Sequence, residues 1–271
     1  MLERGAFGRV VVSDSISYGA ERIGPDDVLL VASYSGVASF IHGLRRGVKA
    51  LIGHDAGIGK DEAGVSGLRF AQTHGVPAAA VSARTAALAN GPSMKNAAIS
   101  RCNEPARALG VHEGQNALEA AHLLLAAPRG RKIDVADAFD NSIHEVFRNA
   151  RGAIYASTSS FVFKAKIPSD VVCIASHTGR VFAESILTLM PRGAIANDAG
   201  MGLQQSGTAG LAILQDAGIC AAAVGAMSAR IGDGLSTYHD GMISALNALA
   251  LSSGVRVGMP ASTAAKLMLG E

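Results

Sequence analysis

The sequence predicts an α/β protein made of internally duplicated, Rossmann-like parallel-sheet layers related by a pseudo-two-fold axis. Two observations predict this class. The phrase "HDAGIG" at 54–59 returns as "NDAGMG" at 197–202, which indicates a repeated fold unit. Apolar runs such as "VVCIAS" alternate with segments of helical periodicity, which is typical of parallel strands covered by helices.

The duplication extends well beyond that phrase. Asp55 and Asp198 are 143 positions apart (198 − 55), and this offset aligns 53–91 with 196–234 without a gap, with 16 of 39 positions identical. Upstream, "PDDVLLVASYSG" matches "PSDVVCIASHTG" at the same offset. We therefore divide the chain into a first α/β repeat at 1–127, a linker containing a helix at 128–152, and a second repeat at 153–271.

The elements of the second repeat follow in order from its pattern. The expected strands are "VVCIAS", "GAIAN" and "ICAAAV", each a short buried run. The expected helices are "GRVFAESILTLM", "SGTAGLAILQDAG" and "STYHDGMISALNALALSS". In the linker, the spacing of Ile143, Val146 and Phe147 predicts one further helix.

Composition narrows the possible partners. The net charge is only +2 and no basic run is longer than a pair, apart from the interrupted "PRGRK", so no nucleic-acid partner is expected. No apolar stretch reaches about 18 residues, so no membrane partner is expected. Three cysteines without C-x-x-C spacing favour a reducing, cytoplasmic location. A mean hydropathy of +0.27 predicts apolar surface buried in a homo-oligomer, most simply a homodimer.

Polar residues follow the strands of the second repeat, where the ends of parallel strands bind ligands. The candidate catalytic residues are His177 as general acid or base, Asp198 as its partner and Ser176 as nucleophile or oxyanion donor. Arg230 is expected to bind a carboxylate. The other candidate substrate-binding residues are Asn197, Gly200, Gly202 and Asp233 here, and Ser33, Tyr34, His54, Asp55 and Lys60 in the first repeat.

Each candidate also has a structural interpretation. The glycines suit left-handed turns, and Asp55 and Asp198 suit helix caps or Asx turns. Arg230 could form a salt bridge with Asp233, and His177 could be a hydrogen-bonded core residue. Cys220 is interpreted as a core residue within a strand.

Metal and cofactor signatures are missing from the sequence. The histidines form no H-x-x-x-H or H-E-x-x-H pattern, "GIGKDEAG" lacks the spacing of a phosphate loop, and no G-x-G-x-x-G follows the first strand of either half. We therefore expect no metal and no cofactor, although a glycine-rich helix entrance could hold a small anion.

The segment 170–234 resembles a bacterial family of conserved proteins in which "SHxG", "NDAGxGKDxAG" and "SARIGDG" recur. Here "SHTG", "NDAGMG" and "SARIGDG" stand in the second repeat, whereas "GKD" stands only in the first, at 59–61. The resemblance implies no reaction. It implies that six residues belong together: Ser176, His177, Asn197, Asp198, Arg230 and Asp233.

These observations lead to three functional hypotheses. The first is a cofactor-independent enzyme of small-molecule catabolism that acts on a small carboxylate or carboxamide, with hydrolysis favoured and isomerase or lyase chemistry by proton abstraction as the alternative. The second is a non-catalytic protein that binds a small anion or a nucleotide. The third is a scaffold whose duplication serves only assembly.

Overall fold

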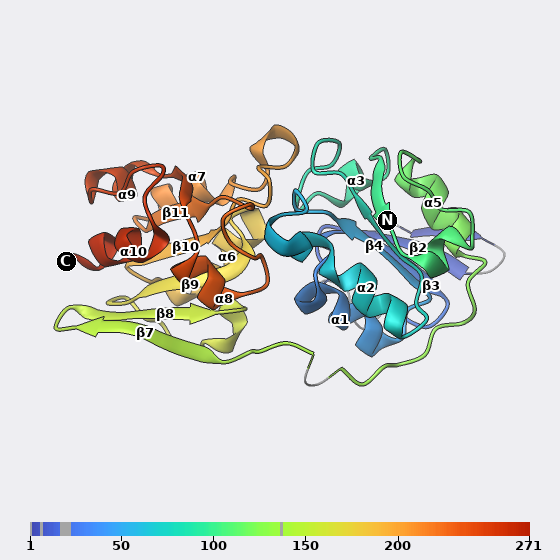
Figure 1. Ribbon diagram of the computed structural model, residues 1–271, viewed down its shortest axis with the longest axis horizontal. Helices are drawn as coiled ribbons and strands as arrows, with labels where there is room; N and C mark the ends of the chain where they lie inside the picture. Colours follow the sequence, from blue (N-terminus) through green and yellow to red (C-terminus); the bar gives the residue numbers. More distant parts are fainter. Residues whose placement is uncertain (1, 6–7, 17–22, 136–137) are drawn as a thin grey trace. The chain divides into compact units, whose positions relative to one another are not determined.

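The computed structural model describes residues 2–5, 8–16, 23–135 and 138–271 (Figure 1). It confirms the α/β class: two sheets of mostly parallel strands are flanked by helices. The chain forms two compact units. The first unit comprises Met1–Gly57, Gly64–Phe139 and Gly202–Gln204, and the second comprises Ile58–Ala63, Asp140–Met201 and Gln205–Glu271.

The sheet of the first unit has six strands that lie side by side in chain order. They are β1 (Leu2–Gly5), β2 (Gly8–Ser13), β3 (Asp27–Tyr34), β4 (Ala50–His54), β5 (Ala78–Val81) and β6 (Ile99–Cys102). The pairs from β2 to β5 are parallel, and the two outer pairs are antiparallel.

The sheet of the second unit has the same order and the same strand directions. Its strands are β7 (Ile143–Asn149), β8 (Gly152–Ser157), β9 (Val171–His177), β10 (Gly193–Asn197), β11 (Cys220–Val224) and β12 (Ile243–Leu246). Among the described strands of either sheet the order never reverses. A crevice at a reversal of strand order, the usual ligand site of doubly wound sheets, therefore has no counterpart among them.

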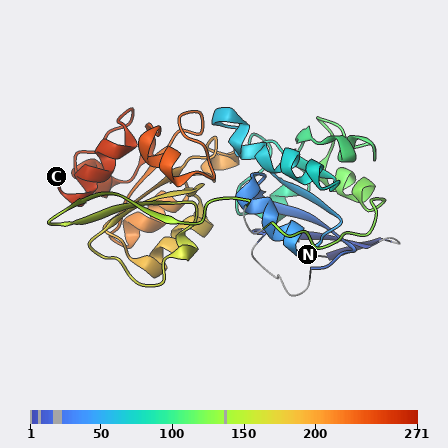
Figure 2. The same cartoon turned by 60° about the horizontal axis from the view of Figure 1, so that its bottom comes forward.

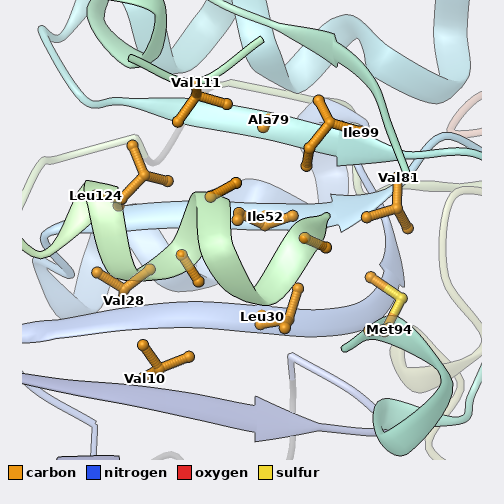
Figure 3. Close-up of a cluster of buried hydrophobic side chains, with 14 of the residues drawn as sticks. Val10, Val28, Leu30, Ile52, Ala79, Val81, Met94, Ile99, Val111 and Leu124 are labelled. Carbon is orange, nitrogen blue, oxygen red and sulfur yellow. The ribbon is translucent and has the colours of Figure 1, made fainter. Parts of the chain in front are cut away.

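Helices cover both faces of the first sheet. They are α1 (Val37–Arg46), α2 (Ser66–Thr73), α3 (Gly91–Met94), α4 (Glu104–Arg107) and α5 (Ala117–Leu124). The 3₁₀ segment η2 (Lys60–Val65) directly precedes α2. Figure 3 shows α5 in front of the sheet, with Leu124 at the end near Val28 and with Leu30 and Ile52 on the strands further along. Small strand residues such as Ala79 let the helix approach the sheet closely.

The second unit has a core on each face of its sheet (Figures 1 and 2). Helices α6 (Arg180–Leu189) and α7 (Gly210–Asp216) contribute to one core, and α8 (Gly234–His239), α9 (Ala248–Ser252) and α10 (Ala261–Leu269) contribute to the other. Two short 3₁₀ segments, η3 (Ser160–Val162) and η4 (Leu203–Gln205), complete the element list. Among the described residues, no helix combines the length and the apolar character needed to cross a membrane.

Two expected helices are wrong. The helix around Ile143, Val146 and Phe147 is instead the edge strand β7, which pairs with β8. The long helix expected over "STYHDGMISALNALALSS" is divided into α8, β12 and α9. Gly241 allows this break, because a side chain there would lie 2.4 Å from the carbonyl oxygen of Thr237.

Candidate functional site

The ends of three parallel strands meet at one edge of the second sheet. In the pairing register, Asn197 lies between His177 of β9 and Val224 of β11. Asp198 follows directly, and its main-chain N–H donates to the carbonyl oxygen of Val224 at 2.8 Å. This edge therefore carries the candidates Ser176, His177, Asn197 and Asp198 on adjacent strand ends.

The carboxylate of Asp198 is held rigidly by one of its two oxygens. Oδ1 accepts hydrogen bonds from the main-chain N–H groups of Gly200 and Ala226, both at 2.9 Å. The residue is only 5% exposed. Oδ2 accepts no hydrogen bond from any residue that the structure describes. A buried carboxylate thus keeps one oxygen available for another molecule.

Gly225 borders the available oxygen. A Cβ atom added to Gly225 would lie 3.9 Å from Asp198 Oδ2, 3.7 Å from Ser228 Oγ and 3.8 Å from Ser244 Cβ. The Ser228 hydroxyl donates to the carbonyl oxygen of Gly225 at 2.7 Å and accepts from the N–H of Met242 at 2.9 Å. The absent side chain of Gly225 therefore leaves space beside Oδ2, which the sequence did not single out.

Asp55 in the first unit has the same geometry. Its Oδ1 accepts from the N–H groups of Gly57 and Ala83, both at 2.9 Å, and it is 4% exposed. Ser82 stands where the second unit has Gly225. Since both copies hold the loop in the same way, the Asx-turn interpretation accounts for one oxygen of each aspartate.

The loop after each aspartate has an unusual backbone. Ala199, Gly200, Met201 and Gly202 have φ angles of +50°, +69°, +64° and +67°, and the matching loop at 56–59 repeats the pattern. Glycine adopts this left-handed conformation readily, whereas other L-residues are disfavoured by about 1–2 kcal/mol each. Gly200 and Gly202 thus have a structural reason to be glycine, and no observation assigns them to a substrate.

His54 and Asn197 are fully buried and serve the main chain. Nδ1 of His54 accepts from the N–H of Ala56, and Nε2 lies 3.1 Å from the carbonyl oxygen of Ala86, to which it donates. Burial lowers the pKa of His54, which keeps the ring neutral. Asn197 likewise uses both amide atoms: Oδ1 accepts from the N–H of Ala199, and Nδ2 donates to the carbonyl oxygen of Ala229. These contacts leave neither side chain accessible to a ligand, so the expected binding roles are replaced by structural ones.

Ser176 and His177 are not brought together as a nucleophile and its base. The Ser176 hydroxyl donates to the main-chain oxygen of His177 at 3.3 Å. Nδ1 of His177 accepts from the N–H of Gly179 at 3.0 Å, and the side chain is buried. Successive strand residues point to opposite faces of a sheet, which explains why adjacency in sequence does not produce a catalytic pair.

Arg230 and Lys60 belong to a charge cluster of five residues in the second unit: Lys60, Asp61, Arg230, Asp233 and Asp240. Arg230 lies 2.9 Å from Asp61, 3.4 Å from Asp233 and 3.6 Å from Asp240. Lys60 Nζ lies 3.0 Å from Asp240. The bonds to Asp61 and Asp233 raise the pKa of Arg230. Two cations thus face three carboxylates, and the structural interpretation of Arg230 as a salt-bridge residue is confirmed.

Asp233 and Asp240 have further structural duties. Asp233 is the N-cap of α8, with its Oδ1 accepting from the N–H of Ser236 at 2.9 Å. Asp240 accepts from the Ser236 hydroxyl at 2.7 Å, and this bond and the one from Lys60 lower its pKa. The sequence did not single out Asp240, because the expected long helix included this residue, whereas in the structure it follows the last residue of α8.

Ser33 and Tyr34 occupy the matching edge of the first unit. The hydroxyl oxygen of Ser33 accepts from the N–H of Ile16 at 2.9 Å. Tyr34 pairs with His54 in the strand register, and burial raises the pKa of its phenol. A tyrosine with a raised pKa stays neutral, so Tyr34 adds no base at this edge.

Comparison with known proteins adds no functional information to this geometry. No family model matches the chain, and neither a curated protein nor a solved structure shows significant similarity to it.

Proposed function

We propose that the protein is a cofactor-independent enzyme of small-molecule catabolism whose general base is Oδ2 of Asp198. One observation carries the proposal. A carboxylate that is 95% buried has one oxygen oriented by two N–H groups and a second oxygen that no described residue engages. Oδ2 is not among the polar side-chain atoms that are fully enclosed without a partner, so a water molecule or a substrate can reach it.

Hydrolysis is the reaction we favour, and the bond that breaks is the C–N bond of a small carboxamide, which can itself carry a carboxylate. Because Ser176 does not bond to the imidazole of His177, the nucleophile in this scheme is a water molecule. Oδ2 of Asp198 accepts its proton as the water attacks the substrate carbonyl carbon. The carboxyl group then returns that proton to the substrate nitrogen, the C–N bond breaks and ammonia leaves. A neutral carboxamide suits the second unit better than a carboxylate, since Lys60 and Arg230 are already paired with acidic groups.

Proton abstraction from carbon is the second candidate, because the same oxygen could serve as the base of an isomerase or lyase. The Ser176 hydroxyl bonds to the main-chain oxygen of His177 rather than to its imidazole, which favours proton abstraction over an acyl-enzyme formed on Ser176. The two reactions differ in products: hydrolysis of a carboxamide releases ammonia, whereas proton abstraction exchanges a substrate C–H for deuterium in heavy water.

The test is a panel of small carboxamides and carboxylates, incubated with the protein in D₂O and followed by ¹H NMR and an ammonia assay. The key variant is Asp198→Asn, which keeps the acceptor at Oδ1 and removes the base. Asp55→Asn is the matched control, because its carboxylate has the same two hydrogen bonds. We expect turnover to disappear in the first variant and to persist in the second. Full activity of Asp198→Asn would exclude Asp198 as the general base. Turnover of no compound in the panel would count against an enzyme and favour a binding protein.

We further propose that the protein is a homodimer in the cytoplasm. The exposed apolar side chains of Phe161, Met227 and Val257 support burial against a second copy. The three cysteines are free, which suits a reducing compartment. Light scattering at micromolar concentration tests the assembly, and a monomeric mass would contradict it.

A further inference from the structure

The second unit contains a short segment, Ile58–Ala63, from the first half of the sequence. A main-chain hydrogen bond joins it to the candidate site at Ala226. The N–H of Lys60 donates to the carbonyl oxygen of Ala226 at 2.9 Å, and the N–H of Ala226 donates to Oδ1 of Asp198 at 2.9 Å. The segment therefore contacts the residue whose N–H orients the proposed general base, through the next peptide group along the chain.

Close packing at Gly59 supports this contact. Its φ is +74°, and an added Cβ would lie 3.0 Å from the Ala226 carbonyl oxygen. Asp61 and Glu62 also have left-handed φ angles, of 53° and 55°. Such conformations are unfavourable for L-residues and persist only when surrounding contacts impose them. Interactions outside the segment must therefore hold it in place.

Two ion pairs add to the main-chain contact at Ala226. The equivalent residues of the other repeat, Gln204 and Gln205, have similar φ angles of 54° and 58° without charges, so the ion pairs supplement the backbone contacts rather than impose the conformation. Lys60 Nζ lies 3.0 Å from Asp240 Oδ2, and Asp61 Oδ2 accepts from Arg230 Nη1 at 2.9 Å. The neighbouring charges of Lys60 and Asp61 are opposite, and so are those of their partners. Both pairs are partly exposed, so each contributes little stability alone, but together they fix the direction in which the main chain approaches Ala226.

The first unit lacks this arrangement. Its matching segment, Gly202–Gln204, has an uncharged leucine at the position of Lys60. The N–H of Leu203 donates to the carbonyl oxygen of Ala86, not to that of Ala83, whose N–H holds Asp55. The hydrogen bond from this segment to the residue whose N–H holds the aspartate is thus specific to the second unit.

We propose that Lys60 is a positioning residue: anchored by Asp240, it holds the segment 58–63 against Ala226 and thereby orients the Asp198 carboxylate. The inference rests on the proposed role of Asp198. It also gives a reason for the two similar aspartate loops to differ in activity. Only in the second unit does a neighbouring segment bond to the residue whose N–H orients the carboxylate.

The test replaces Lys60 by Met and by Arg, replaces Asp240 by Asn, and exchanges the charges in a Lys60→Asp/Asp240→Lys double variant. Arg148→Gln is the matched control, because it breaks a partly exposed pair with Glu145 in the same unit. Two readouts are used: the hydrogen-exchange rate of the Ala226 amide by NMR, which needs no substrate, and kcat and KM on the substrate identified above.

We expect Lys60→Met and Asp240→Asn to accelerate exchange at Ala226 and to lower kcat about tenfold with KM changed less than about twofold. Lys60→Arg and the charge exchange should restore both values, and Arg148→Gln should alter neither. Unchanged Ala226 exchange in Lys60→Met and in Asp240→Asn would overturn the inference even if Asp198→Asn is inactive. Loss without rescue by Lys60→Arg or the charge exchange would overturn it as well. An active Asp198→Asn variant would instead refute the proposed function.

Discussion

His54 and Asn197 make the same two hydrogen bonds at equivalent positions of the two units. Each accepts from the N–H two residues ahead, at 3.0 Å in His54 and 2.8 Å in Asn197. Each also donates to a carbonyl oxygen 32 residues ahead, Ala86 or Ala229, at 3.1 and 3.0 Å. An imidazole and a carboxamide thus fill one structural role, because both present an acceptor and a donor at similar separation.

His54→Asn should therefore preserve the fold and reduce the acid sensitivity of the protein. Burial lowers the pKa of His54 below its ordinary value of 6.5. Below pH 6.5 His54 binds a proton in the unfolded chain but not in the native state, so the free energy of unfolding falls as the pH falls. Above pH 6.5 the ring is neutral in both states, and its contribution does not depend on pH. Urea unfolding at pH 8 and pH 5.5 should show a smaller loss in the variant than in the wild type.

The comparison is internally controlled. His42, whose pKa burial also lowers, is present in both proteins and cancels in the difference. At pH 8 the two stabilities should agree within about 1.5 kcal/mol, the net value of one hydrogen bond. An equal loss between the two pH values in both proteins would show that His54 is not the group responsible.

Gly225→Ala should lower activity without destabilising the protein. The new methyl group meets its neighbours at ordinary contact distances of 3.7–3.9 Å, one of them Oδ2 of Asp198. It would desolvate that oxygen and obstruct substrate, so we expect a loss of about tenfold in kcat/KM. Thermal unfolding should show unchanged or slightly higher stability.

Gly234→Ala is the contrasting variant. Its Cβ would lie 2.5 Å from main-chain atoms of Ser157, so we expect destabilisation of about 3 kcal/mol. If Gly225→Ala keeps full activity, the space beside Gly225 is not the approach to Asp198.

Cys220→Ser should leave activity within about twofold of the wild type. Cys220 begins β11, about 13 Å along the strand from the end that precedes Gly225. Cys220 should also be the thiol labelled by a maleimide in the native protein. Cys102 and Cys173 are buried, and burial raises the pKa of Cys173 to about 12. Mass spectrometry of the labelled protein checks the site, and complete inactivation of the variant would assign Cys220 a catalytic role.

Asn247→Asp should destabilise the protein by about 3 kcal/mol. Oδ1 of Asn247 accepts from Ala221 and Ala250, while Nδ2 donates to the carbonyl oxygen of Ile219 at 2.9 Å. A carboxylate would lose that donor and face the carbonyl oxygen at close range. Asn116→Asp is the control: Asn116 caps α5 only as an acceptor, a role that aspartate fills equally well. Urea unfolding of both variants measures the contrast.

The fold could be predicted because its strongest signals are local. Runs such as "VVCIAS" are too apolar for an exposed strand, and the repeated phrase indicated two similar units. The strand β7 could not be predicted in the same way. A register irregularity between Glu145 and Phe147 breaks its two-residue alternation, and the apolar residues that remain have a helix-like spacing.

The candidate site could be predicted only in part. The positions of His177, Asn197 and Asp198 at one sheet edge follow from the order of strands and turns. The sequence does not show which polar atoms the main chain occupies. The side chains of Asn197 and His54 use their polar atoms in hydrogen bonds to main-chain groups, whereas Oδ2 of Asp198 has no such bond. This difference depends on distances of about 3 Å between segments far apart in the chain.

The left-handed loops have a consequence for chemical synthesis. Ala56 and Ala199 both have a φ of +50°, which an L-residue adopts at a disadvantage of about 1–2 kcal/mol. For the mirror-image amino acid the same angle is the relaxed one. A chain assembled by peptide ligation with D-alanine at these two positions would relieve that backbone strain, while each methyl group would move to the position of the α-hydrogen. By their φ angles, two stereocentres of this protein suit the configuration opposite to the one that ribosomes supply.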